Sequence, residues 1–375
     1  MNLGEERLMK ESMQDNDQLE QLIAKGRLPA AVVSSECPAL PAPAGGIDLR
    51  DRFQGCLLGV AIGDALGRPG EGRPHSATVE RYGGPLREFK PWRGWTSGPV
   101  GTITDDTQMT MCIAESIVAT GRIDFEEMGL RFASWLSYGR GKGRTCVEAC
   151  SRLRDGIPWY EAGVKSAGNG AAMRTAPLGL LRYRDLRSLR VDSAIVAMIT
   201  HADPTAIASA IAQSSCIAFC LTQTADSVDV RGLIDFVVEM IDGIEPHDIE
   251  ERRPGGGQTT LAKRLSELPD LLRNPDSREV YNYLYNGAFV LESLPTAFYA
   301  FLQNHESFDE AMFAAVDAGY DCDTSGSLAA ALAGALHGRS GIPTHWLEGL
   351  EHCKELIELA DEIFRLSAES ECEIR

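Results

Sequence analysis

A helix with glycines along one face constrains this fold more than any other segment. Gly55, Gly59 and Gly63 recur every four residues in an apolar stretch, so they share one helical face. Each glycine costs a helix roughly 1 kcal/mol relative to alanine, so three at this spacing indicate tight packing against another backbone. The stretch ends in the Gly- and Pro-rich residues 67–72, which predict a loop carrying the Glu71 carboxylate. A carboxylate on such a loop is ordinarily just solvated.

Helical periodicity continues through the rest of the chain. Apolar residues fall at helical spacing, with little of the alternation typical of strands, in residues 109–119, 125–136, 206–221, 281–301 and 327–336. The 375 residues, 44% of them hydrophobic, suffice for one large or two ordinary domains with a real core. We therefore expect an almost entirely α-helical globular protein.

The charge balance excludes several classes of partner. There are 54 acidic and 36 basic residues, a formal charge of −18, so nucleic acid and anionic membranes should be repelled. The longest apolar stretches are about half of what a bilayer requires. Residues 1–30 carry charges throughout and do not resemble a secretory signal. The ten cysteines include no Cys-x-x-Cys pair, which favours buried free thiols and a cytoplasmic location.

Two oxygen-rich steps precede apolar helical runs, at residues 104–107 (Thr-Asp-Asp-Thr) and 321–324 (Asp-Cys-Asp-Thr). Taken alone, the first step fits a helix start, because Thr and Asp satisfy unpaired N–H groups there. Taken together, four carboxylates near an apolar core would repel one another unless cations neutralised them. Oxygen donors select Mg²⁺, Mn²⁺ or Ca²⁺ over zinc. Two such divalent cations would neutralise the four carboxylates, and a dinuclear centre of hard cations indicates chemistry on a phosphate- or sugar-bearing substrate.

Two further segments are candidate ligand contacts. Two glycines flank Asn169 within residues 166–177, and their backbone N–H groups could approach a phosphate or ribose closely, although an ordinary turn also explains them. His201 stands ahead of a long helical stretch and could face a cavity, although a lone histidine is more often structural.

The N-terminal residues 1–46 differ from the rest. Leu19, Leu22 and Ile23 give a thin apolar stripe, and the following residues 28–46 are rich in Pro, Ala and Gly. This composition fits a floppy tail, a linker, or an extended strap laid on another surface, in the last case an arm that binds a partner. We expect residues 1–46 to form an N-terminal extension and residues 47–370 to form one domain.

Five motifs, in order, make residues 51–337 resemble the ADP-ribosylglycohydrolase family, and most closely its bacterial dinitrogenase-reductase-activating members. They are residues 63–67, 104–107, 168–174, 200–201 and 321–324. Three departures are visible. Ala288 replaces a glycine, Ala318-Gly319-Tyr320 replaces a Gly-Gly pair, and Ser166 stands where some members carry an acid.

The resemblance implies an all-α orthogonal multi-helix fold with a dinuclear site for two Mg²⁺ or Mn²⁺ ions. It implies metal ligands at Thr104, Asp105, Asp106, Asp321, Asp323 and Thr324. It implies contacts to a buried ADP-ribose from Gly168, Asn169, Gly170, His201 and Phe289. Catalytic roles would fall to Glu71, Asp106 and Asp323, with Glu71 as a gate or acid–base residue.

The function that follows is metal-dependent hydrolysis of the bond between ADP-ribose and a protein side chain, with arginine as the first choice. Some members of the family protect bacteria against ADP-ribosylating toxins, so the ADP-ribosylated protein and a toxin are the candidate partners. The alternative is an inhibitor whose residues 1–46 block the active site of such a toxin. The intact set of acidic residues favours the enzyme over a degenerate protein that only binds ADP-ribose.

Overall fold

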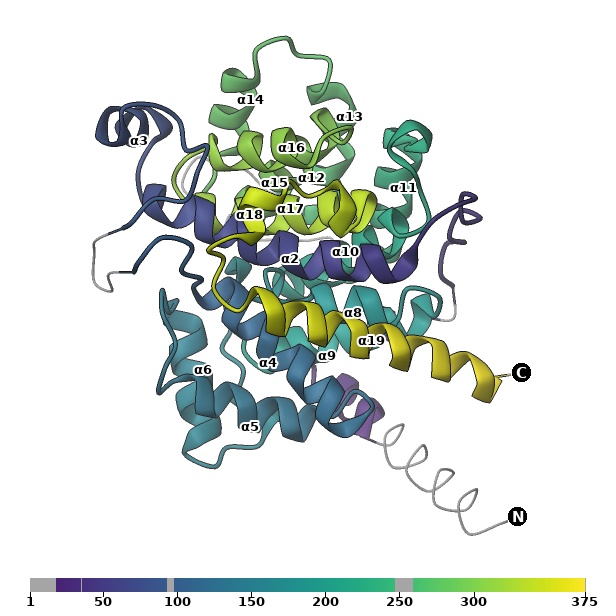
Figure 1. Ribbon diagram of the computed structural model, residues 1–375. Coiled ribbons are helices and arrows are strands. Elements are labelled where there is room, and N and C mark those ends of the chain that lie inside the picture. The colour runs from purple at the N-terminus through teal and green to yellow at the C-terminus, as the bar shows by residue number, and fades with distance from the viewer. Residues whose placement is uncertain (1–17, 35, 93–97, 247–258, 375) are drawn as a thin grey trace.

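The computed structural model describes residues 18–34, 36–92, 98–246 and 259–374 (Figure 1). The described residues form helices with only isolated β-bridges between them, which confirms the all-α prediction. The helices of the first half span Leu49–Gly67 (α2), His75–Tyr82 (α3), Asp105–Thr120 (α4), Phe125–Trp135 (α5), Arg144–Arg154 (α6), Trp159–Ala162 (α7), Ala176–Leu181 (α8), Leu186–Met198 (α9) and Pro204–Cys220 (α10). Those of the second half span Val230–Met240 (α11), Leu261–Ser266 (α12), Leu268–Leu271 (α13), Ser277–Leu284 (α14), Val290–Gln303 (α15), Phe308–Val316 (α16), Cys322–His337 (α17), Thr344–Leu347 (α18) and Cys353–Ile374 (α19). None of the described helices combines the length and apolar character needed to cross a membrane.

The glycine face of α2 packs directly on α17, as its spacing predicts. A Cβ added at Gly55, Gly59 or Gly63 would lie under 3.0 Å from backbone atoms of α17. The contacts run antiparallel, since the start of α2 meets the end of α17 and Gly67 meets the Cys322 backbone. The two helices therefore lie side by side through the middle of the molecule, and the end of α2 stands beside the start of α17 (Figure 1).

The other long helices surround this pair. Helix α17 also contacts α10, α15 and α16, while α19 packs along α2, α4 and α8 (Figure 1). Buried aliphatic and aromatic side chains from all of these helices form one continuous core. The described cysteines are free thiols and most are buried, as expected from their scattered positions.

One predicted helix is interrupted. The periodicity of residues 281–301 predicted a single helix, but α14 ends at Leu284 and α15 begins at Val290. Tyr285 has a positive φ of 59°, which an α-helix cannot contain. The buried side-chain amide of Asn286 then donates to the carbonyl of Gly319 at 2.7 Å. The break therefore places a polar segment beside the start of α17.

The described part of the N-terminal extension lies on the body of the chain. Residues 18–24 are helical, and Leu22, Leu28 and Val32 are buried in the core. Arg190 of α9 donates to the carbonyls of Ser34 and Glu36. This part is thus a strap on the chain's own surface, whereas the sequence left open a flexible tail, a linker, or a strap laid on another surface. Residues 1–17 of the predicted extension lie outside the described residues.

Candidate metal and ligand site

The two acidic steps meet across one cavity. Helix α4 begins at Asp105, and Asp321 is the N-cap of α17, so both steps are helix starts. The cavity has a volume of about 970 Å³ and is lined by every predicted site residue except Thr104. The sequence therefore predicted which segments converge, although they are separated by more than 200 positions along the chain.

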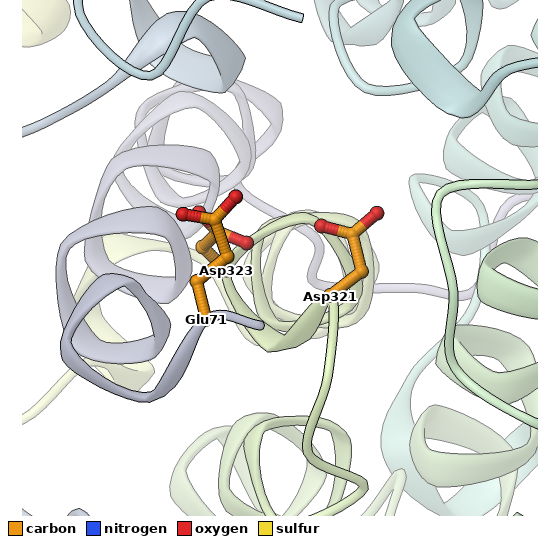
Figure 2. Close-up of side chains that lie close together, drawn as sticks. All are labelled: Glu71, Asp321 and Asp323. Atoms are coloured by element: carbon orange, nitrogen blue, oxygen red, sulfur yellow. The ribbon is translucent and has the colours of Figure 1, made fainter. Parts of the chain in front are cut away.

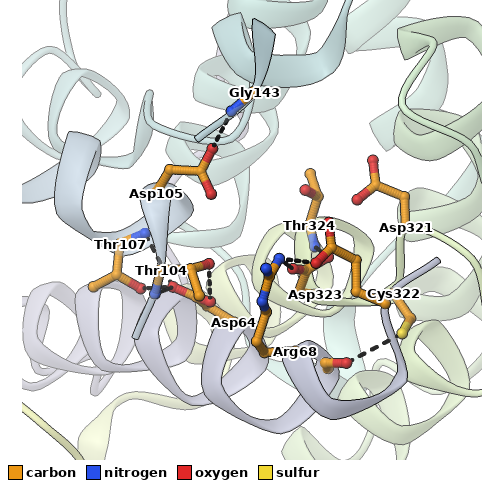
Figure 3. Close-up of polar contacts among 12 residues, drawn as sticks. Asp64, Arg68, Thr104, Asp105, Thr107, Gly143, Asp321, Cys322, Asp323 and Thr324 are labelled. Carbon is orange, nitrogen blue, oxygen red and sulfur yellow. Dashed lines mark hydrogen bonds and ion pairs between the residues drawn. The ribbon is translucent and has the colours of Figure 1, made fainter. Parts of the chain in front are cut away.

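Asp64 of α2 accepts hydrogen bonds from both threonines of the first step (Figure 3). Its carboxylate is fully buried and accepts the backbone N–H of Thr104 at 2.8 Å and of Thr107 at 3.2 Å. The hydroxyls of Thr104 and Thr107 donate to the same carboxylate, at 2.7 and 2.5 Å. Burial raises the pKa of Asp64 to about 6, although these hydrogen bonds act in the opposite direction. Asp64 thus supplies the N-terminal cap that Thr104 does not supply itself.

The carboxylates of the first step itself have few donors. Asp105 accepts one backbone N–H, that of Gly143 at 3.3 Å (Figure 3). The Oδ1 atom of Asp106 is buried and has no hydrogen-bond partner among the described residues. Burial, reinforced by neighbouring carboxylates, raises the pKa of both Asp105 and Asp106 well above the usual value. Among the described residues, neither carboxylate of the first step forms an ion pair, and the charge of Arg68 only partly offsets the raised pKa of Asp105.

The carboxylates of the second step have protein partners. Asp321 accepts the side-chain amide of Asn169 at 2.6 Å. Asp323 accepts the backbone N–H of Thr324 at 3.0 Å and lies 3.2 Å from the guanidinium of Arg68 (Figure 3). Burial, followed by the charge of Asp321, raises the pKa of Asp323 to about 7. Arg68 partly offsets this effect.

Glu71 reaches the same place from the loop after α2 (Figure 2). One carboxylate oxygen each of Glu71, Asp321 and Asp323 lie within 4.8 Å of one another, and Arg68 forms an ion pair with Glu71. The loop is fastened to the start of α17, because Gly72 donates to the Tyr320 carbonyl at 2.7 Å. Tyr320 has a φ of 54°, in the left-handed region that ordinarily favours glycine.

The donor set fits a hard divalent cation. The grouped side chains offer carboxylate and hydroxyl oxygens, which Mg²⁺ and Mn²⁺ prefer. The buried, unpartnered Oδ1 of Asp106 is the strongest sign, because an unpaired buried oxygen of this kind is costly without a positive partner. Thr104 donates its hydroxyl proton to Asp64, so the oxygen retains lone pairs for a cation.

The predicted ligand loop forms another wall of the cavity. The backbone N–H of Asn169 donates to the carbonyl of Ala288 at 3.1 Å, which brings Phe289 beside Gly168. Ala288 takes part through its backbone, so its replacement of glycine preserves this contact. The hydroxyl of Ser166 accepts a hydrogen bond from the hydroxyl of Thr145 at 3.0 Å. His201 precedes α10 and faces the same cavity.

Four residues of the site carry no role that could be predicted from the sequence. Asp64 and Arg68 lie beside the acidic steps, and the basic residues Arg144 and Lys165 line the cavity. The signal for Asp64 was its position directly after Gly63, on the helix with the glycine face. The two basic residues carried no spacing signal, since their proximity arises only from the fold.

Comparisons with known proteins point to one family. Residues 46–372 match the family described as ADP-ribosylglycohydrolase. The chain is 27% identical to the ADP-ribosylhydrolase ARH3 of Gallus gallus, over 84% of this chain and 93% of that relative. It is 27% identical to an ADP-ribosylarginine hydrolase of Serratia proteamaculans, over 86% of this chain and 81% of the relative. A solved structure described as an ADP-ribosylglycohydrolase-related protein complex aligns with a TM-score of 0.65 and 28% identity, covering 85% of this chain and 98% of that chain.

Proposed function

Because this chain belongs to the ADP-ribosylglycohydrolase family, we propose that it hydrolyses the glycosidic bond between ADP-ribose and a protein side chain. The observation that carries the proposal is the convergence of Asp105 and Asp106 with Asp321 and Asp323 on one cavity. The cavity volume of about 970 Å³ lies at the upper end of the range usual for small-molecule sites, which suits a dinucleotide-sized ligand.

The substrate that we propose is ADP-ribosyl-arginine. A relative from Serratia proteamaculans is named an ADP-ribosylarginine hydrolase, and the guanidinium group of such a substrate is cationic. The carboxylates of Glu71 and Asp105 line the cavity and would attract that cation. The name of the ARH3 relative specifies no linkage, so other linkages remain competitors and serve as the comparison in the experiment.

The two acidic steps are the proposed metal ligands. Two Mg²⁺ or Mn²⁺ ions would be held by Thr104, Asp105, Asp106, Asp321, Asp323 and Thr324. When bound, they supply Lewis acidity, which polarises sugar oxygens and lowers the pKa of water at the site. Asp106 and Asp323 would also stabilise positive charge that develops on the ribose.

The remaining walls hold the substrate and move protons. Glu71 stands at the cavity on a loop and would exchange a proton with water or with the leaving group. The Gly168–Asn169–Gly170 backbone and His201 would bind the diphosphate and ribose. Phe289 would pack against the adenine.

The test is release of free ADP-ribose from matched peptides modified on arginine or on serine, with Mg²⁺ or with a chelator. We expect release from the arginine peptide, dependence on the metal, and loss in Asp323→Asn. Asp317→Asn is the matched control, since Asp317 pairs with Arg87 outside the cavity. Release from the serine peptide alone would replace the substrate assignment, and no release from either would overturn the proposed function.

The toxin-inhibitor alternative has weaker support. Leu22, Leu28 and Val32 of the extension contribute to the chain's own core, so these apolar side chains do not offer a free face to a partner. We propose that residues 18–46 stabilise the domain instead. Deletion of residues 1–45 should therefore lower the melting temperature. Protection against a toxin that survives Asp323→Asn but disappears with this deletion would favour the inhibitor.

A further inference from the structure

We propose that His201 acts as a neutral hydrogen-bond donor through Nε2, and that Arg174 and Thr200 are positioning residues that fix this tautomer. The identity of the acceptor rests on the proposed function, namely an oxygen of the ADP-ribose diphosphate or ribose. The tautomer itself rests on the hydrogen bonds behind the imidazole ring.

The backbone of His201 is held by a neighbouring segment. The N–H of Val164 donates to the carbonyl of Thr200 at 2.9 Å, and the N–H of Ala202 donates to the carbonyl of Val164 at 2.8 Å. The ring is 2% exposed and lies against the ligand loop, where a Cβ on Gly170 would lie 3.2 Å from Nε2. The ring therefore has a defined position at the wall of the cavity.

The hydrogen-bond chain behind the ring determines where its proton lies. A guanidinium N–H of Arg174 donates to the Thr200 hydroxyl at 2.7 Å, and that hydroxyl lies 2.7 Å from Nδ1 of His201. Arg174 can only donate, so the hydroxyl oxygen accepts this bond and its single proton is directed to Nδ1. Nδ1 is thus an acceptor, and the ring proton of the neutral imidazole lies on Nε2.

The opposite tautomer would leave the Thr200 proton without a partner. The helical acceptor for a threonine hydroxyl at this position is the carbonyl of Val196, four residues earlier. Arg174 donates to that carbonyl at 2.9 Å, but the Thr200 hydroxyl forms no hydrogen bond with it, and among the described residues its one acceptor partner is Nδ1 of His201. A buried, unpaired hydroxyl costs about 1–3 kcal/mol, which favours the Nε2–H form.

Arg174 also keeps the ring neutral. Its guanidinium is fully buried, donates to the Gly170 carbonyl at 2.9 Å, and forms no ion pair with a carboxylate within the described parts of the chain. Burial lowers the pKa of His201 to about 3, and the charge of Arg174 acts in the same direction. An imidazole in this environment cannot serve as the proton shuttle at neutral pH.

The Nε2–H group has no protein acceptor in the region described and faces the cavity. A nearly buried donor of this kind is suited to a phosphate or hydroxyl oxygen of a ligand, and it rejects a cation or another donor. Arg174, Thr200 and His201 therefore form a relay that presents one N–H to the substrate.

The test combines ¹⁵N NMR of the histidine rings in the full-length protein with calorimetric binding of ADP-ribose. We expect the wild-type His201 signal to show a protonated Nε2 and an unprotonated Nδ1 at neutral pH. Thr200→Val removes the hydroxyl, should mix the tautomers, and should weaken ADP-ribose about tenfold. Thr200→Ser should restore both properties. Thr222→Val is the control, because that buried hydroxyl bonds the Phe219 carbonyl away from the cavity.

A protonated Nδ1 or an imidazolium in the wild-type spectrum would overturn the proposal, and this measurement needs no variant to fold. Unchanged tautomer and affinity in Thr200→Val would overturn the relay. An Nε2–H signal in a protein that fails to bind ADP-ribose would support the relay and overturn the assigned ligand, which separates this inference from the proposed function.

Discussion

The two acidic steps have the same chemistry but differ in how the protein neutralises them. At the start of α4, Asp64 fixes the backbone and the threonine hydroxyls, while the Oδ1 atom of Asp106 has no partner. At the start of α17, Asp321 and Asp323 accept donors from Asn169 and Arg68. The first step is therefore held by hydrogen bonds from behind but forms no ion pair among the described residues, whereas the second accepts an amide donor and shares one guanidinium with Glu71.

This difference indicates that the two steps contribute differently to metal binding. A preformed group of oxygens without a cationic partner gains most when a cation binds, because no protein contact has to be broken first. The second step must exchange the contact between Arg68 and Asp323 for metal coordination. We therefore expect the first step to set the affinity for metal and the second to adjust during substrate binding.

The largest effect should come from removing one carboxylate of each step. Asp106→Asn and Asp323→Asn should each lower ADP-ribose release by about 10³-fold, because each removes a proposed ligand and charge stabiliser. In a chelator, Asp106→Asn should raise the free energy of unfolding by about 1 kcal/mol, because it deletes an unneutralised buried charge. Asp323→Asn should not, because it also removes one of the two ion-pair partners of Arg68.

Activity assays and chemical denaturation of the same samples measure both properties. Full activity in either variant would contradict the metal-centred site. Equal stabilisation by both variants would remove the distinction between the steps.

The next effect concerns the helix pair that brings the steps together. Gly63→Ala places a methyl group against the Gly326 backbone, and overpacking of this kind costs about 1–3 kcal/mol or more. Gly84→Ala is the control, since no atom lies within 4 Å of its added Cβ. Thermal denaturation compares the two variants. A Gly63→Ala protein as stable as the control would show that the contact is not a stabilising constraint.

A smaller effect is expected from the residue behind the first step. Asp64→Asn replaces an acceptor-only carboxylate by an amide, so part of its bonding to Thr104 and Thr107 is lost. Loss of such support behind ligands typically weakens metal binding about 10–100-fold. Titration calorimetry with Mn²⁺ measures this affinity, with Asp317→Asn as the control. Unchanged Mn²⁺ affinity would mean that the rigidity of the first step does not matter for the metal.

Replacing Arg68, which lies beside the second step, should strengthen metal binding rather than weaken it. Arg68→Met keeps an apolar stem beside Trp92 but removes the charge that lies 3.2 Å from Asp323. We expect Mn²⁺ to bind about tenfold more tightly, because a competing cation is gone, and the chelated protein to be less stable. Weaker Mn²⁺ binding would show that Arg68 assists the metal instead. Arg81→Met is the control, since Arg81 contacts Tyr82 away from the cavity.

The smallest effect is the pH dependence of stability that arises from His201, which belongs to neither acidic step. The pKa of His201 is lowered from 6.5 to about 3. Below pH 6.5, the imidazole is therefore protonated in the unfolded chain but stays neutral in the folded chain. Stability therefore falls as the pH is lowered from 6.5 towards 3. Between neutral pH and about pH 5, this contribution amounts to about 2 kcal/mol and should be absent in His201→Gln. Denaturation at both pH values measures it, and parallel profiles would contradict a neutral buried imidazole.

Local patterns in the sequence were sufficient for the helical fold, the glycine face and the two acidic steps. The spacing of Gly55, Gly59 and Gly63 depends only on helix geometry, and Asp106 and Asp323 stand at helix starts that their own flanking residues define. The grouping of these steps came from the resemblance to a family and from charge repulsion.

Contacts made between distant segments could not be predicted. Asp64 caps a helix that begins 41 residues later, and nothing in its own neighbourhood indicates which helix that is. The break after Leu284 was missed because apolar spacing continues through a turn that tertiary bonds from Asn286 stabilise. The tautomer of His201 depends on Arg174, whose place in the motif at residues 168–174 does not indicate this contact.

The contact between α2 and α17 also limits how this sequence can change in length. Gly59 meets Ala330 and Gly63 meets Gly326, so each step of four residues along one helix is matched by four residues back along the other. One inserted residue would rotate the remainder of its helix by about 100° and turn its glycines away from the partner. Insertions and deletions should therefore accumulate in the loops, and single-residue changes in the length of either helix should be eliminated by selection.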